Sequence, residues 1–282
     1  MAGKRIRPAV SAGEHKFYPS DRRRLDALLD EMLGPDAPAG QAPEGPEPLA
    51  LVVPHAGYRF SGPTAARAYR LLRGRRFDRV IVVAPSHYAR FAGASVFDGD
   101  SFETPLGLVE VDRAFVQELL RDDSLFHFYP AAEEREHSLE VQLPFLMRVL
   151  TDFRLVPVLI SDQSYDNVSR VARALRDTMH RLGGKTLLVA SSDLYHGPNH
   201  QYAMAQSREA AAALERLNPE DFLDGIEAGE YQACGAGAIG AAMMVALAEG
   251  ARSARVVDLT TSYEVYPVRD DYVVGYLSAV LS

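Results

Sequence analysis

The sequence has little of several features that mark particular protein classes. It contains one cysteine, Cys234, in 282 residues. A single cysteine allows no intrachain disulfide, which excludes a disulfide-stapled scaffold and fits a reducing cytoplasm. Long apolar runs are also missing, because the most apolar stretch, 236–247, falls well short of the roughly 20 residues that span a bilayer. We therefore expect a soluble, cytoplasmic protein with no membrane partner.

Positive charge is scarce as well. The chain has 30 Lys and Arg against 38 Asp and Glu, which gives a net charge of −8. No basic tail or stripe stands out, and this argues against a nucleic-acid partner. The opening residues, MAGKRIRPAV, lack the apolar core of a secretory signal. Hydrophobic residues make up 47% of the chain, an ordinary globular value.

The chain is long enough to bury a substantial core. Residues 21–33 carry leucines at helical spacing after Ser20, a plausible N-cap, and predict a helix. Residues 34–48 are rich in Pro, Gly and Ala and predict an exposed loop. Because the segment before this loop is too short for a core of its own, we expect one domain over 1–282 with an N-terminal helical appendage.

Predicted strands alternate with predicted helices along most of the chain. Strands are expected at 49–53, 79–84, 155–160 and 186–190, and helices at 63–73, 136–150, 165–182 and 236–249. Pro63 suits the first position of its helix, and Pro144 marks a kink or a break in the helix at 136–150. This order predicts an α/β fold, with a mixed, mainly parallel sheet covered by helices on both faces.

Polar side chains follow three of the expected strands. His55 stands in LVVPHAGYRFSG, His87 ends RVIVVAPSH, and Asp193 and His196 lie in LLVASSDLYHG. The carboxyl ends of parallel strands meet at one edge of a sheet, where ligands bind in open α/β folds. The sequence therefore predicts a shared site, in which Asp193 and His196 could act as acid and base. For each residue alone, capping of the next helix is the alternative.

Cys234 lies directly before the apolar stretch 236–247. The positive end of the helix dipole there is expected to lower the pKa of the thiol and favour the thiolate. A thiolate with two imidazoles suits iron, copper or zinc, so His55, His87 and Cys234 are candidate metal ligands. The alternative is a buried small hydrophobic side chain, the commonest fate of a free cysteine.

Three further residues are candidates for substrate binding. His137 and Glu140, in EHSLEVQLPFL, could reach the same pocket, or could be ordinary polar residues of a first helical turn. Tyr58, with Arg59 after it, could bind an anionic or aromatic ligand, or could be an ordinary loop residue.

Several blocks together resemble the Memo family, called AmmeMemoRadiSam system protein B in prokaryotes. They are RPAVSAG, FYP, PHAGYRFSG, APSHY, FETPLG, EHSLEVQLPFL, VPVLI, SSDLYHG, ACGAGAI and YVVGYLSAVL. Memo proteins are similar in fold to class III extradiol dioxygenases, which hold Fe(II) with two histidines and a carboxylate. The resemblance implies His55 and His87 as ligands, Cys234 in the third place, and His196 as the acid–base histidine. A thiolate in place of the carboxylate shifts the preference towards copper or another soft metal.

Three functions follow as hypotheses. The first is a metal-binding redox protein with one transition metal ion, which would be a dioxygenase-like oxidoreductase if it turns over a substrate. The second is a metal-free hydrolase with Cys234 as nucleophile, His196 as its base and Asp193 orienting the base. The third is a metal-free binding module for a peptide. The resemblance implies a radical-SAM protein and a further protein as partners, and the composition is compatible with a homodimer.

Overall fold

Parallel strands form the centre of the main sheet in the computed structural model, which describes residues 4–35, 45–267 and 271–282. They are β2 (Ala50–Val53), β9 (Thr186–Ser191), β3 (Arg79–Pro85) and β8 (Arg154–Ile160), adjacent in that order. Almost all of their residues are buried. Continuous apolar runs of this kind are typical of parallel strands covered on both faces.

Antiparallel neighbours extend this centre on both sides. β12 (Val273–Leu281) pairs antiparallel with β2, and carries β11 (Ala254–Thr261) and the short β10 (His196–Gly197). On the other side β4 (Ala94–Val96) pairs antiparallel with β8, and β7 (Phe126–His127) pairs with β4. The predicted α/β fold with a mixed sheet is confirmed, and the adjacent pairs among β2, β9, β3 and β8 are parallel.

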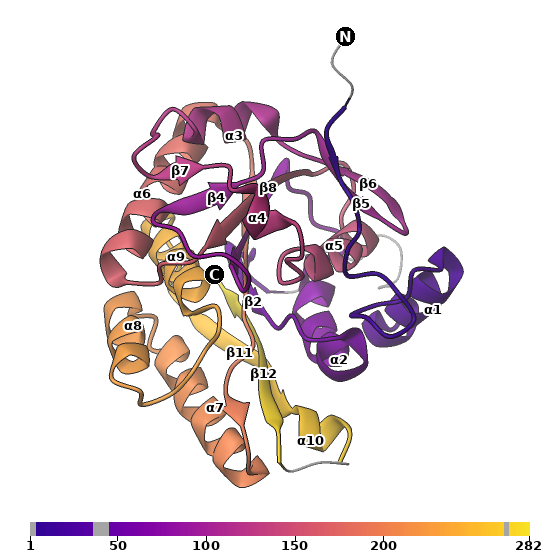
Figure 1. Ribbon diagram of the computed structural model, residues 1–282. Coiled ribbons are helices and arrows are strands. Elements are labelled where there is room, and N and C mark those ends of the chain that lie inside the picture. Colours follow the sequence, from indigo (N-terminus) through magenta and orange to yellow (C-terminus); the bar gives the residue numbers. More distant parts are fainter. Residues whose placement is uncertain (1–3, 36–44, 268–270) are drawn as a thin grey trace.

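Helices cover both faces of this sheet (Figure 1). The connection from β2 to β3 runs through α2 (Tyr58–Tyr69), and that from β8 to β9 runs back across the sheet through α6 (Tyr165–Leu182). Right-handed crossovers in opposite directions place their helices on opposite faces. α9 (Ala236–Ala248) packs beside α6 and against β2, β3 and β9, so both faces are covered as predicted.

The remaining helices lie around this framework. They are α1 (Arg22–Leu33), the 3₁₀ helix η1 (Arg70–Leu72), α3 (Arg113–Leu119), α4 (Pro130–Glu133), the 3₁₀ helix η2 (Glu140–Gln142), α5 (Leu143–Val149), α7 (His200–Glu215), α8 (Pro219–Glu227) and α10 (Ser262–Val265). A small second sheet, in the order β1 (Ile6–Arg7), β5 (Ser101–Thr104) and β6 (Gly107–Glu110), ties the N-terminal segment to the molecule.

Two predicted helix boundaries were wrong. α2 begins at Tyr58, not at 63, so Pro63 lies inside the helix, where it removes one main-chain hydrogen bond. The predicted helix at 136–150 is irregular until η2 and α5, and Pro144 sits in the first turn of α5, where its missing N–H has no cost. The cap of α1 is Asp21 in place of Ser20, since the Asp21 side chain accepts from Arg24 N.

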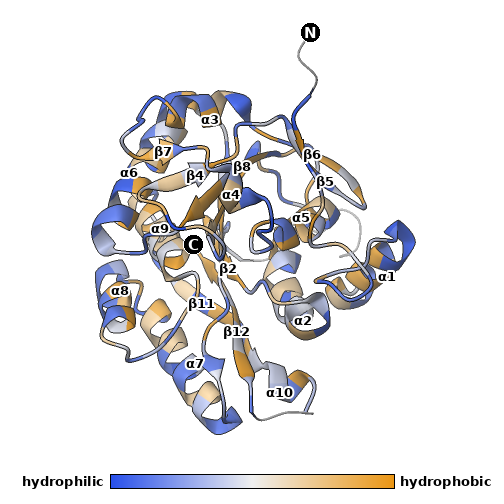
Figure 2. Ribbon diagram, in the orientation of Figure 1, coloured by the Kyte–Doolittle hydropathy of each residue, from blue (hydrophilic) through white to orange (hydrophobic). Residues whose placement is uncertain are grey.

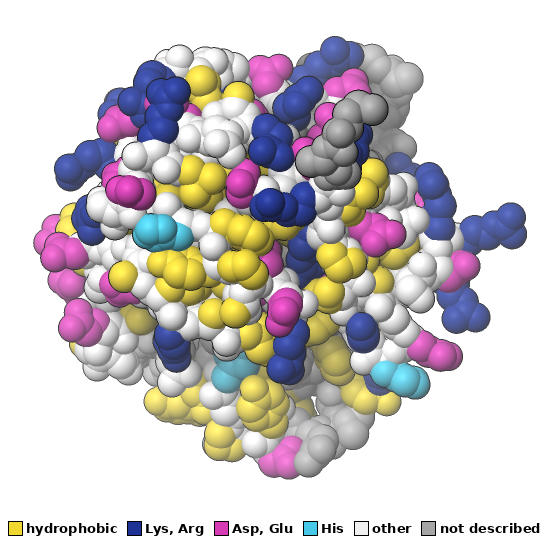
Figure 3. Space-filling model, turned by 45° about the horizontal axis from the view of Figure 1, so that its top comes forward, with side chains coloured by type: hydrophobic (Ala, Val, Ile, Leu, Met, Phe, Trp, Pro, Cys, Tyr) yellow, Lys and Arg dark blue, Asp and Glu magenta, His cyan; other side chains and the backbone are white. Residues whose placement is uncertain are grey.

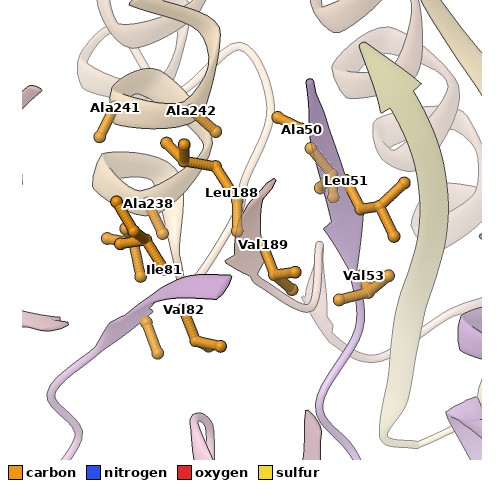
Figure 4. Close-up of a cluster of buried hydrophobic side chains, with 14 of the residues drawn as sticks. Ala50, Leu51, Val53, Ile81, Val82, Leu188, Val189, Ala238, Ala241 and Ala242 are labelled. Atoms are coloured by element: carbon orange, nitrogen blue, oxygen red, sulfur yellow. The ribbon is translucent and has the colours of Figure 1, made fainter. Parts of the chain in front are cut away.

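The core lies between α9 and the central strands. Figure 4 shows Ala238 and Ala242 of α9 beside Leu188 and Ile81 of the sheet. Small side chains let the helix approach the strands closely, and α9 is buried almost all round. In Figure 2 the central strands are coloured as hydrophobic and the outer helices carry hydrophilic stretches.

The main cluster of buried apolar side chains runs from Tyr18 to Leu281. A core shared along the chain is what a single domain requires, and the single domain over 1–282 stays a prediction. Of the predicted loop at 34–48, residues 36–44 lie outside the described residues.

Charged side chains of both signs are interspersed with hydrophobic ones on the face drawn in Figure 3. The prediction that the chain has no nucleic-acid partner rests on the net charge and stays a prediction. Within the described part of the chain, no helix is both long enough and apolar enough to cross a membrane.

Candidate metal centre

The carboxyl ends of the central strands carry the candidate site. β2 is followed by Pro54 and His55, β3 by Ser86 and His87, and β9 by Ser192 and Asp193. The main-chain N–H of His55 donates to Asp193 Oδ1 at 2.8 Å, which ties the ends of β2 and β9 together. The structure thus brings His55, His87 and Asp193 to one edge of the sheet.

Three imidazoles meet there. One ring nitrogen from each of His55, His87 and His137 lies within 4.8 Å of the others. The ring centroids are 5.2 Å apart for His55 and His87, 5.5 Å for His55 and His137, and 4.8 Å for His87 and His137. The side chain of His55 is 2% exposed, that of His137 14% and that of His87 29%, so the cluster leads from the interior towards solvent.

Hydrogen bonds fix the proton of His55. Its Nδ1 lies 2.9 Å from Ser191 Oγ. That hydroxyl donates its one hydrogen to the carbonyl of Ser138 at 2.6 Å and accepts from Gln142 Nε2 at 2.8 Å. It can therefore only accept from the histidine, which places the ring proton on Nδ1. Nε2 of His55 keeps its lone pair.

His87 is held in the same way by a carboxylate. Its Nδ1 lies 2.9 Å from Glu136 Oε1, and its main-chain N–H donates to Glu136 Oε2 at 2.7 Å. The His87 hydrogen bond is the largest of the causes that lower the pKa of Glu136, which falls to about 2 although burial opposes this. An ionised carboxylate can only accept, so His87 also carries its proton on Nδ1.

His137 is stacked between two rings. Its ring lies 4.1 Å from that of Phe17 and nearly parallel to it, with His87 on the other side. His137 Nδ1 is buried, lies 3.5 Å from Glu136 Oε1, and has no hydrogen-bond partner among the described residues. Burial, followed by the charge of neighbouring histidines, lowers the pKa of His55 and of His137 to about 3. Both rings are therefore neutral at pH 7, the form that binds a metal ion.

Cys234 comes to the same place from a different element. Its Sγ lies 3.1 Å from His55 Nε2 and accepts from the main-chain N–H of Asp193 at 3.2 Å. Gly235 lets the chain approach β9, because a Cβ there would lie 2.3 Å from the carbonyl oxygen of Ser191. Gln163, after β8, donates to Cys234 O at 2.9 Å and fixes the loop from the other side.

The thiol does not behave as the helix dipole alone predicts. Burial, and next the charge of Asp193, raise the pKa of Cys234 above its ordinary value. In the metal-free chain the thiol is therefore protonated and faces the lone pair of His55 Nε2. A bound cation is what would favour the thiolate here, with release of the proton. The donor set of imidazoles and a thiol fits a transition metal ion.

The predicted acid–base residues lie beside the cluster. Asp193 is 4% exposed, its Oδ2 lies 4.0 Å from His55 Nε2, and burial raises its pKa to about 6. His196, on β10, is exposed, and its Nδ1 donates to Leu194 O at 2.9 Å. The acid–base role of both residues stays a prediction.

Two predicted substrate contacts have other partners. Tyr58 is buried in α2, and its hydroxyl donates to Val141 O at 2.6 Å. Glu140 is fully buried, pairs with Arg7, and accepts from Tyr18 Oη at 2.6 Å. These contacts fix the core and the N-terminal segment. Of the substrate contacts proposed from the sequence, His137 alone stands in the histidine cluster.

The sequence reasoning missed three residues that build the site. Glu136 orients His87, Gln163 holds the Cys234 loop, and Phe17 stacks on His137. The signal for Glu136 was its place directly before His137, in a segment already singled out. Gln163 and Phe17 act through contacts far along the chain, which no local pattern reveals.

Comparison with known proteins gives a consistent result. The sequence model of the Memo family, described as Memo-like protein, matches residues 7–280. MEMO1 family proteins of Methanopyrus kandleri, Aeropyrum pernix and Aquifex aeolicus are 32%, 34% and 32% identical to this chain. These matches cover 97%, 96% and 98% of this chain and 97%, 98% and 99% of the relatives.

A solved structure shares the fold. The crystal structure of an uncharacterised protein from Escherichia coli K12 matches with a TM-score of 0.56 and 15% identity, over 84% of this chain and 100% of that one. Identity at this level supports the likeness of fold alone. The family match over nearly the whole chain and the relatives above 30% identity show that the chain belongs to the Memo family.

Proposed function

We propose that the chain is a metal-binding redox protein in which His55, His87 and Cys234 hold one transition metal ion. The observation that carries the proposal is the fixed tautomer of two converging imidazoles. Ser191 and Glu136 hold a ring proton of His55 and of His87 on Nδ1, so that Nε2 is the ring nitrogen available to a metal ion. Metal-ligating histidines commonly donate their other ring N–H to a carboxylate or another acceptor in this way.

The donor set indicates which ions fit. Imidazole suits iron, copper and zinc, and a thiolate favours the softer ions, copper among them. Iron and copper change oxidation state, and zinc does not, so the redox proposal requires iron or copper. A bound ion would supply a Lewis acid and an electron acceptor or donor. Asp193 and His196 would move protons beside it, with His196 on the exposed side of the site.

The metal-free hydrolase receives less support from the geometry. The imidazole next to the thiol is that of His55, at 3.1 Å, and His196 is not among the hydrogen-bond partners of Cys234. A thiol whose pKa is raised by burial is a weak nucleophile at neutral pH. The hydrolase predicts rapid alkylation of Cys234 that chelators do not change. The metal site predicts alkylation that speeds up when the metal is removed.

Elemental analysis of the purified protein tests the proposal. Protein purified without a metal-affinity tag is expected to contain about one iron or copper ion per chain, because one such histidine cluster lies within the described residues. His55→Ala, His87→Ala and Cys234→Ala are expected to lose the ion with their circular dichroism unchanged. His180→Ala, on the exposed surface of α6, is the matched control and should keep it. Equal metal content in all four variants would overturn the proposal.

Partners and location are proposed on other grounds. A radical-SAM protein as partner follows from the family resemblance, and a cytoplasmic location follows from the cysteine content. If the chain is a binding module without a metal, it should bind that partner saturably and contain no stoichiometric ion. A homodimer is tested by sedimentation.

A further inference from the structure

Glu136 occupies a central place between two of the histidines. Its carboxylate is 1% exposed and accepts from His87 at two points, the main-chain N–H and Nδ1. It also accepts from the main-chain N–H groups of His137 and Ser138, each at 3.0 Å. One side chain thus joins the loop after β3 to the segment that carries His137.

The two carboxylate oxygens of Glu136 accept hydrogen bonds from different groups. Oε2 takes the main-chain N–H of His87, and Oε1 takes His87 Nδ1 together with His137 N and Ser138 N. The main-chain N–H groups of His87, His137 and Ser138 can only donate, and the lowered pKa of Glu136 keeps its carboxylate ionised. Both oxygens therefore accept, and His87 Nδ1 donates. The arrangement leaves His87 one neutral form, with its proton on Nδ1 and its lone pair on Nε2.

The N-terminal segment holds Glu136 from behind. The Arg7 guanidinium donates to the carbonyl oxygens of Glu133 and Glu136, and pairs with the carboxylate of Glu140. Arg7 lies on β1, which pairs with β5 in the second sheet. Arg7 therefore ties the main chain at Glu133 and Glu136, and the side chain of Glu140, to the N-terminal segment.

We propose that Glu136 is a positioning residue of the metal centre. It fixes Nε2 as the ligating atom of His87, and it holds the main chain at His87 and at His137 in fixed positions relative to each other. The inference rests on the proposed function for its metal, but its tautomer can be measured without one. Second-layer partners of this kind are worth about 10–100-fold in metal affinity.

The test combines one variant with one spectroscopic measurement. In metal-free wild-type protein, the ¹⁵N shifts of His87 should show a proton on Nδ1. Glu136→Gln keeps the shape of the side chain but has one acceptor oxygen. Whichever way its amide is turned, the NH₂ group faces one of the two His87 donors, so one of those contacts is lost. We expect the metal affinity of this variant to fall about 10–100-fold.

Glu133→Gln is the matched control. It makes the same chemical change three residues earlier, at a buried carboxylate that lies 3.9 Å from Arg7, and the hydrogen bonds of His87 do not involve it. Its metal affinity should stay within about twofold of wild type, well inside the loss expected for an orienting partner.

The outcomes distinguish the positioning role of Glu136 from the proposed metal-binding function. A neutral His87 ring protonated on Nε2 in wild-type protein overturns the inference, with or without metal binding. Equal metal affinity in Glu136→Gln and wild type, or an equal loss in Glu133→Gln, also overturns it. A wild-type chain that binds no metal but shows the Nδ1 tautomer overturns the proposed function and supports the role of Glu136 in orienting His87.

Discussion

Residues 133–140 contribute to two buried polar clusters that differ in the charge and the hydrogen bonding of their side chains. At Glu140 a carboxylate meets the guanidinium of Arg7, and its oxygens accept from Val10 N, Ser11 N and Tyr18 Oη. At His137 three imidazoles meet, and His137 Nδ1 is buried without a hydrogen-bond partner among the residues that the structure describes. In the first cluster both oxygens of Glu140 accept hydrogen bonds, although Arg7 Nε has no hydrogen-bond partner among the described residues. The histidine cluster leaves a buried ring nitrogen without a hydrogen bond. Such a group lowers the stability of the fold and is typical of a functional site.

Breaking the Glu140 cluster should have the largest effect on stability. Arg7→Ala leaves the carboxylate of Glu140 buried without its cation, and loss of one partner of a buried pair costs about 3–5 kcal/mol. Urea unfolding followed by circular dichroism measures the change in the free energy of unfolding. Arg22→Ala is the control, because its pair with Asp26 is exposed and is worth about 0.5 kcal/mol at most. A loss in Arg7→Ala no larger than in the control would contradict the assignment.

A second effect is a pH dependence of stability that comes from Glu133, which lies 3.9 Å from Arg7 beside the Glu140 cluster. Burial raises the pKa of Glu133 to about 7, from its ordinary value of 4.5, and the charge of Arg7 opposes the shift. Because the folded chain holds this proton more tightly than the unfolded chain, Glu133 favours the folded state most at acidic pH. That contribution is lost as pH rises from about 4.5 to above 7.

The difference in unfolding free energy between wild type and Glu133→Gln isolates this group from the other titrating side chains. We expect wild type to lose stability relative to the variant over this range. A difference that is flat from pH 4 to 8, or that rises with pH, would show that Glu133 is not a carboxyl with a raised pKa.

The smallest effect on stability is expected from replacing His137 in the histidine cluster by an apolar residue. His137→Leu replaces a buried ring that has an unpartnered nitrogen with an apolar side chain against Phe17. Substitutions that relieve functional sites commonly add about 0.5–2 kcal/mol. Thermal unfolding of the metal-free variant and of metal-free wild type measures this gain. If His137→Leu destabilises the protein, His137 stabilises the fold, as Glu140 does, and the contrast between the two clusters is wrong.

Much of the site could be predicted from the sequence, because its main residues follow strands of strong apolar pattern. His55, His87 and Asp193 each come directly after a buried strand, and the parallel centre of the sheet brings such strand ends together. The placement of Cys234 before α9 was equally readable from the apolar run.

The orienting residues could not be predicted in the same way. Glu136 lies in an irregular segment that the sequence had predicted as a helix, and its partners are 49 residues away at His87. Arg7 contacts residues 126 to 133 positions further along the chain. Nor did the helix dipole at Cys234 predict the pKa of its thiol, because burial and Asp193 outweigh it.

The most direct test of the metal centre is a crystal structure of the metal-loaded protein with anomalous data at the absorption edge of the ion found by elemental analysis. We predict one strong peak within bonding distance, about 2.0–2.3 Å, of Nε2 of His55, Nε2 of His87 and Sγ of Cys234. A stoichiometric ion bound elsewhere, or a peak bonded through Nδ1 of either histidine, would contradict the account.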